Sequence, residues 1–96
     1  MSRGTTYKFR LFIAGDTQNS IQALANLRAL CRLLLPVGHE IEVVDVLREP
    51  KRALADGVLL TPTLVILAPT PVRKIVGTLS QPETVLHALG LEPVNS

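Results

Sequence analysis

Cys31 is the only thiol in this chain of 96 residues, so thiol chemistry is the first activity to consider. Exchange between a dithiol and a disulfide needs two thiols, which one copy of the chain cannot supply, whereas a one-thiol reaction with glutathione stays open. Cys31 lies at helical spacing from Leu27 and Leu34, on a stripe where burial favours the neutral thiol and weakens the nucleophile. We interpret Cys31 as a core residue rather than a catalytic one.

The other reactive side chains lack suitable neighbours. His39 and His87 stand far apart, without a cysteine or a pair of carboxylates at the spacing of metal ligands. Asp16, Thr17 and Ser20 are close together, but no histidine or lysine base lies beside them. We interpret these three as a loop in which Ser20 caps a helix. The sequence thus predicts no catalytic, cofactor-binding or metal-binding residues, and a protein that is not an enzyme.

Composition predicts one small domain, residues 1–96, with flexible ends at about 1–6 and 92–96. Apolar residues make up 47% of the chain and charged residues only 19%, which excludes intrinsic disorder. This low charge content indicates that a partner, or a second copy of the chain, covers some apolar surface. With one cysteine and no signal peptide at its start, the chain is expected in the cytoplasm.

Nucleic acids and membranes are not expected partners. The formal net charge is only +2, the basic residues fall in small scattered groups, and three aromatic residues offer little stacking surface. The weakly charged stretch between Gly57 and Glu83 resembles a membrane span at first sight. Pro62, Pro69 and Pro71 divide it into runs far shorter than the roughly 20 residues that a spanning helix needs. We interpret this stretch as buried strands.

Hydrophobic periodicity predicts a strand, a helix and a second strand in the first half of the chain. Residues 7–14 first alternate between apolar and charged side chains and then become fully apolar. The apolar residues within 21–35 recur at helical spacing. Pro36 and Gly38 end this helix. The second strand spans Ile41–Val46, and the helix between the two strands makes them parallel.

The second half of the chain predicts a short helix, two strands and a final helix. The expected ranges are a helix at about 50–56, strands at 63–67 and 72–76, and a helix through 85–89. Pro50 suits the first turn of the short helix, and a stiff turn at Pro69–Pro71 joins the two strands. A capping box at Ser80–Glu83 opens the last helix, and Gly90 ends it.

This order, β-α-β-α-β-β-α, predicts a single α/β domain with a thioredoxin-like fold. In that fold a redox dithiol would lie in the loop between the first strand and the first helix, but Gly15–Ser20 contains no cysteine. Pro62 precedes the third strand, where such folds often hold a cis-proline. The alternative to a non-enzymatic protein is a thioredoxin-like redox or glutathione-dependent protein acting through Cys31.

Six short segments carry a family resemblance when they are taken together. They are Leu11–Gly15, Asn19–Ser20, Val44–Leu47, Leu60–Leu64, Pro71–Gly77 and Leu79–Ser80. Thr61-Pro62-Thr63 alone would mean little, but the order and spacing of the six segments are specific. Through them the chain resembles, nearly from end to end, the KaiB family of circadian clock proteins.

The resemblance implies a regulator without a cofactor that docks on a KaiC-like ATPase ring and modulates its ATPase or phosphorylation cycle. It also implies KaiA or a SasA-like kinase as further partners, and self-association to a dimer or tetramer. The residues expected to contact the ring are basic, namely Lys51, Arg52, Arg73 and Lys74. The acidic tail of clock members is absent, and four positions lack their basic residues, which argues against contacts with KaiA. These positions are Gln22, Glu42, Gly57 and Ile66.

The resemblance also implies two folds for one sequence. Besides the thioredoxin-like form, family members adopt a ground state with the order β-α-β-β-α-α-β, in which the second half is rearranged. The candidate fold-switch or cis-proline positions are Pro62, Pro69, Pro71, Gly77, Ala88 and Gly90. Ala88 favours a helix more than glycine does, by roughly 0.5–1 kcal/mol, and Gly90 suits a helix end. We therefore expect this chain to favour the thioredoxin-like form.

Overall fold

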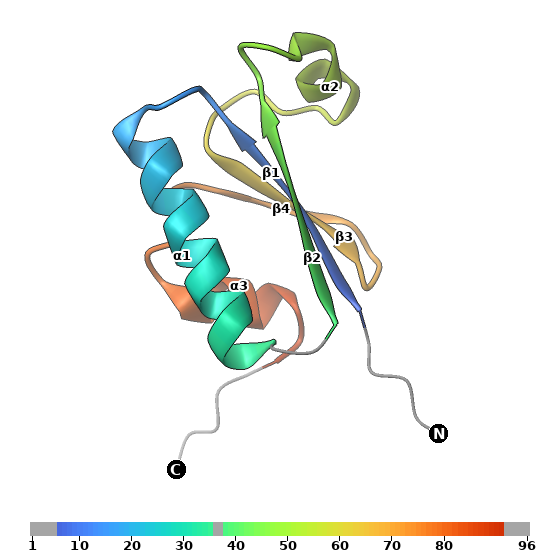
Figure 1. Ribbon diagram of the computed structural model, residues 1–96. Helices are drawn as coiled ribbons and strands as arrows, with labels where there is room; N and C mark the ends of the chain where they lie inside the picture. The colour runs from blue at the N-terminus through green and yellow to red at the C-terminus, as the bar shows by residue number, and fades with distance from the viewer. Residues whose placement is uncertain (1–5, 36–37, 92–96) are drawn as a thin grey trace.

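Four strands form one mixed sheet in the computed structural model, which describes residues 6–35 and 38–91 (Figure 1). The strands are β1 (Tyr7–Ile13), β2 (His39–Asp45), β3 (Thr63–Ala68) and β4 (Arg73–Val76). The helices are α1 (Gln18–Leu34), α2 (Pro50–Ala55) and α3 (Pro82–Ala88). The spatial order of the strands is β2-β1-β3-β4, with β1 parallel to β2 and the other pairs antiparallel. The predicted order of elements and the thioredoxin-like fold are confirmed.

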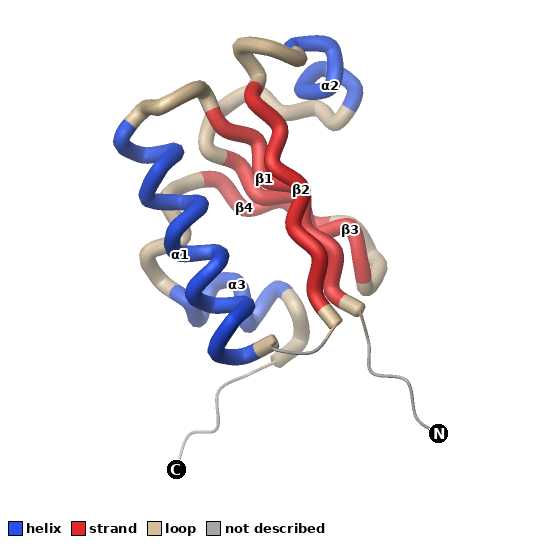
Figure 2. The backbone as a smooth tube through the Cα atoms, in the orientation of Figure 1, coloured by secondary structure: helices blue, strands red, loops and turns tan. Residues whose placement is uncertain are grey.

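The sheet separates two apolar cores because side chains alternate between its faces. Helices α1 and α3 lie side by side over one face, where Phe9 and Leu11 of β1 pack (Figures 1 and 2). Phe12 points to the other face, into a smaller core that includes Ala53 of α2 and Val58 just after it. In Figure 2, α2 stands at the end of the sheet where β1 and β2 finish. Among the described residues, a helix therefore covers this second face only near the end where β1 and β2 finish.

Both predicted helix caps are wrong. Helix α1 begins at Gln18 after an extended Thr17, and α3 begins at Pro82 after Gln81, without a side-chain cap bond in either case. Ser20 lies inside α1, where its buried hydroxyl accepts hydrogen bonds from Thr17 Oγ1 at 2.8 Å and from the Ala14 amide at 3.0 Å. The serine oxygen thus ties the end of β1 to α1 instead of capping a helix.

Other local predictions are confirmed in part. The stretch interpreted as buried strands is buried in β3, but β4 is an edge strand in which Lys74 and Val76 are exposed. Gly90 follows α3 with a left-handed φ of +76°, as a helix-ending glycine does, whereas Ala88 is the last residue of that helix rather than an interior one.

The three candidate cis-prolines all lie within the described residues. The peptide bonds that precede Pro62, Pro69 and Pro71 are all cis. Pro36 lies outside the described residues, as do 1–5 and 92–96, which make up nearly all of the ends expected to be flexible.

Candidate protein-docking surface

The thiol of Cys31 is enclosed in the core between α1 and the sheet. Its side chain has no exposed surface, and burial raises the pKa of the thiol to about 11. At neutral pH the group is therefore protonated and a poor nucleophile. The prediction that Cys31 is a core residue is confirmed, and the fold does not bring it to the loop where thioredoxin-like folds place their reactive thiols.

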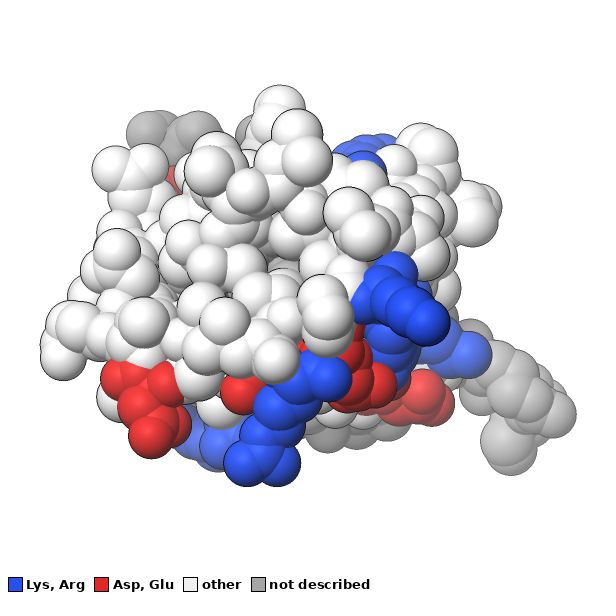
Figure 3. All heavy atoms as spheres, turned by 90° about the horizontal axis from the view of Figure 1, so that it is seen from above, with Lys and Arg blue, Asp and Glu red and all other residues white. Residues whose placement is uncertain are grey.

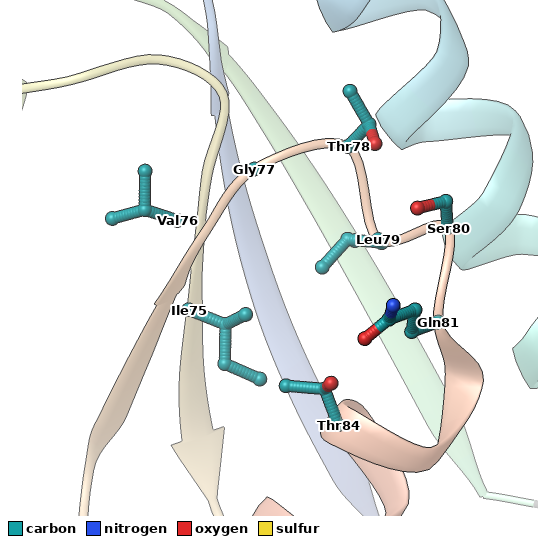
Figure 4. A pocket seen from close by; sticks show the side chains of 8 residues that line it. All are labelled: Ile75, Val76, Gly77, Thr78, Leu79, Ser80, Gln81 and Thr84. Carbon is teal, nitrogen blue, oxygen red and sulfur yellow. The ribbon is translucent and has the colours of Figure 1, made fainter.

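One hollow beside the sheet is lined by uncharged residues alone. It is a cavity of about 230 Å³ between the end of β4 and the start of α3, and its eight labelled lining residues are uncharged (Figure 4). Within residues 6–35 and 38–91, no three His, Cys, Asp or Glu side chains lie close enough together to hold a metal ion. In the same residues, no helix is long and apolar enough to cross a membrane.

Five exposed apolar side chains belong to β4, α2 and the loops at the end of the sheet where β1, β2 and β4 finish. We name this set the apolar end, and it consists of Leu47, Leu54, Leu59, Leu60 and Val76. Each of these side chains is more than half exposed, and Leu59 reaches 88%. Viewed onto this end of the molecule, uncharged residues cover most of the surface, and most of the visible charged residues lie along one border (Figure 3). A surface of this kind is typical of a protein-interaction site.

Lys74 belongs to this surface, whereas its neighbour Arg73 does not. Side chains alternate along β4, so Arg73 points to the same face as Ile75, which packs on the core beneath α1 and α3. Lys74 and Val76 point to the other face, where they line a pocket of about 210 Å³ with Leu59 and Leu60. The predicted basic pair is therefore divided between two faces of the sheet.

The two basic residues of α2 also differ from each other. Arg52 forms ion pairs with Glu42 of β2 at 2.7 Å and with Glu49 at 3.7 Å, so its charge is balanced within the chain. Lys51 is exposed, and no ion pair involves it among the described residues. Lys51 and Lys74 are thus the two predicted residues whose charges remain available to a partner beside the apolar end.

The charges under α2 form a connected network on the face of the sheet. Arg10 donates from Nε to Glu42 at 2.8 Å and from Nη1 to Asp56 at 2.8 Å. Glu42 also pairs with Arg52, and hydrogen bonds from Arg10 and then Arg52 hold the pKa of Glu42 below its usual range. This network links two strands of the sheet to both the middle and the end of α2.

Sequence reasoning missed the exposed leucines. Periodicity assigns apolar residues to a core, and nothing in the spacing of the leucines at 47, 54, 59 and 60 marks them as exposed. The available signal was the low charge content, which indicated covered apolar surface without giving its place. The position of the surface depends on how α2 sits on the sheet.

Comparisons with known proteins agree with the resemblance seen in the sequence. A family model described as the KaiB domain matches residues 10–91. The circadian clock oscillator protein KaiB of Prochlorococcus marinus is 43% identical over 91 residues, covering 95% of this chain and 78% of the relative. The protein of the same name from Synechococcus elongatus is 42% identical over 91 residues, which are 95% of this chain and 89% of the relative.

Solved structures show the same fold at low sequence identity. The N-terminal domain of Synechococcus elongatus SasA superposes with a TM-score of 0.75 at 14% identity, covering 100% of this chain and 94% of that one. Mitochondrial thioredoxin 3 from Saccharomyces cerevisiae gives a TM-score of 0.70 at 19% identity, covering 88% of this chain and 76% of that one. At these identities the similarity establishes the fold alone.

Proposed function

Since the chain belongs to the KaiB family, whose curated relatives are circadian clock oscillator proteins, we propose that it is a non-enzymatic regulator that docks on a KaiC-like ATPase ring. Docking would modulate the ATPase or phosphorylation cycle of the ring. The observation that carries the proposal is the apolar end, flanked by Lys51 and Lys74, which form no ion pair within residues 6–35 and 38–91.

The energetics favour a docking role for the apolar end. Burying one leucine side chain contributes roughly 1.5–3 kcal/mol, while association of two proteins costs roughly 4–15 kcal/mol in lost freedom. Covering four leucines and one valine contributes free energy of the same order as this cost. Lys51 and Lys74 beside them favour a partner surface with carboxylates, because paired charges steer association and fix its orientation.

Other partners belong to the same proposal. A second copy of the chain can cover the apolar end, so a dimer or tetramer would compete with the ring for it. A SasA-like kinase would compete for the ring in turn, because the N-terminal domain of SasA shares this fold. We also propose KaiA as a weaker partner and the cytoplasm as the place of action.

The test compares two neighbouring charge reversals. The chain is mixed with the purified KaiC-like ATPase of its own organism in ADP and in ATP, and co-elution and affinity are measured. Lys74→Glu should weaken the complex at least about tenfold, since an anion would replace a cation at the contact. Arg73→Glu changes the net charge equally on the opposite face of β4 and should weaken the complex much less.

Two results would contradict the proposal. The first is the absence of a complex with the wild-type chain in every nucleotide and phosphorylation state of the ATPase. The second is an equal loss of affinity for the two reversals, because a nonspecific effect of net charge would then explain both.

A further inference from the structure

We propose that Arg10 is a positioning residue for the docking surface: it fastens α2 to the sheet and thereby sets how the apolar end is presented. This inference deepens the proposed function, on which it rests. Arg10 lies on β1, outside the apolar end, and no motif in the sequence singled it out.

Helix α2 cannot hold its place by itself. It contains only six residues, far fewer than an isolated helix needs in water. Among those six, Ala53 is the only buried residue, and a methyl group offers little packing energy. Lys51 and Leu54 point into solvent. The position of α2 must therefore depend on contacts made from outside the helix.

Arg10 supplies such contacts with two separate edges of its guanidinium group. Nε reaches Oε1 of Glu42 on β2, while Nη1 reaches Oδ2 of Asp56, the residue at the C-terminal end of α2. The other oxygen of Glu42, Oε2, pairs with Nη2 of Arg52 in the middle of the helix. The helix is thus held at two points by one chain of charges. A lysine at position 10 could not form this planar fork.

The burial of this pair makes it more than a surface contact. The side chains of Arg10 and Asp56 are 24% and 25% exposed, so water screens their attraction less than that of a fully exposed pair. By contrast, Arg48 and Asp45 are 3.9 Å apart, and Arg48 is 87% exposed. We therefore expect Arg10 and Asp56 to restrain α2, and the Arg48 pair to contribute little.

Asp56 leads directly into the docking surface. Gly57 follows it with a left-handed φ of +68°, and Lys74 lies against that glycine. Leu59 and Leu60 follow the buried Val58, and they line the pocket that contains Lys74. A shift of Asp56 would therefore move the two leucines relative to Lys74. This is the route by which a residue on the sheet affects the docking surface without touching a partner.

The test uses Arg10→Gln with Lys8→Gln as its matched control. Lys8 lies on the same strand and the same face, loses the same charge on substitution, and forms no ion pair among the described residues. In the free protein, Arg10→Gln should speed amide hydrogen exchange in residues 50–60 roughly tenfold, while exchange in β3 stays unchanged. Lys8→Gln should leave both regions unchanged. Arg10→Lys should give an intermediate rate, because it restores the charge without the fork.

Binding to the KaiC-like ATPase provides the second measurement. Arg10→Gln and Asp56→Asn should each weaken it roughly five- to tenfold, and the double variant should lose little more, since both remove the same contact. If Arg10→Gln and Lys8→Gln give the same exchange rates in residues 50–60, the inference is overturned whether or not the ATPase binds. A wild-type chain that fails to bind overturns the proposed function, while the exchange rates still decide the role of Arg10.

Discussion

The ammonium group of Lys74 lies against the backbone of Gly57, so that a Cβ atom placed on this glycine would come within 3.0 Å of Lys74 Nζ. The contact joins the edge strand β4 to the loop that follows α2. Gly57 has a φ of +68°, a conformation that side chains other than glycine rarely adopt. Two costs therefore oppose a larger residue at position 57: the backbone strain and the displacement of the lysine.

Gly57→Ala should lower the free energy of unfolding by about 1 kcal/mol, mainly through backbone strain. The flexible lysine can move aside at small cost. Urea unfolding of Gly57→Ala in the wild-type chain and in a Lys74→Ala background measures the two contributions. Nearly equal losses in both backgrounds are expected. A loss that vanishes in the Lys74→Ala background would show that the lysine, not the backbone, makes glycine necessary.

Val58 and Leu59 are adjacent, but alanine at the first position should destabilise the fold and alanine at the second should mainly weaken binding. Val58 is 7% exposed within the core beneath α2, so Val58→Ala should reduce the unfolding free energy by about 2 kcal/mol. Leu59 is 88% exposed, so Leu59→Ala should change it by less than about 0.5 kcal/mol. The second variant should nevertheless weaken binding to the KaiC-like ATPase. A destabilising Leu59→Ala would mean that this side chain packs within the chain.

Ser20→Ala tests whether the Ser20 hydroxyl, which does not cap α1, stabilises the link between β1 and α1. The substitution removes the buried Ser20 oxygen that accepts from the half-buried Ala14 amide and the exposed Thr17 hydroxyl. It should cost roughly 1–2 kcal/mol of unfolding free energy. Ser80→Ala is the matched control, since α3 has no side-chain cap bond. Thermal or urea unfolding measures both. An equal cost for the two variants would contradict the tertiary role of Ser20.

Cys31 should make stability and reactivity depend on alkaline pH. Burial raises its pKa from 9.0 to about 11, so the unfolded chain loses this proton before the folded chain does. The stabilising contribution of the neutral thiol is therefore complete below about pH 9 and is lost as pH rises toward 11. Urea unfolding across this range, with Cys31→Ala as control, should show the loss only in the wild type. At pH 8, roughly one native thiol in a thousand is ionised, so thiol reagents should label the native chain slowly.

Glu42 should make stability depend on acid pH in the opposite sense. Its folded-state pKa lies below the ordinary value of 4.5 because Arg10 and then Arg52 hydrogen-bond its carboxylate. The contribution is present above pH 4.5 and is lost as pH falls through the lowered pKa. The effect should be small, since the side chain is 44% exposed. Glu42→Gln should reduce the loss of unfolding free energy as pH falls below 4.5. An unchanged loss would mean that other carboxylates cause this pH dependence.

The order of elements was predictable because local patterns encode it. Alternation at the start of β1 and the helical spacing of Leu27, Cys31 and Leu34 each report a single element and its buried side. The caps were not predictable in the same way. Ser20 and Ser80 have the residue type of a cap, but the hydroxyl of Ser20 is engaged by the end of β1, and Pro82 suits the first turn of α3 without help from Ser80.

For this protein, the sequence alone determined the succession of strands and helices, the burial of the single thiol and the family, because these depend on residue spacing within short segments. Only the tertiary structure decided which of Arg73 and Lys74 lies beside the apolar end, that Arg52 is paired while Lys51 is not among the described residues, and that the exposed leucines lie at one end of the sheet. These properties depend on which strand lies beside which and on where α2 rests. Contacts between residues far apart along the chain determine both the pairing of the strands and the position of α2.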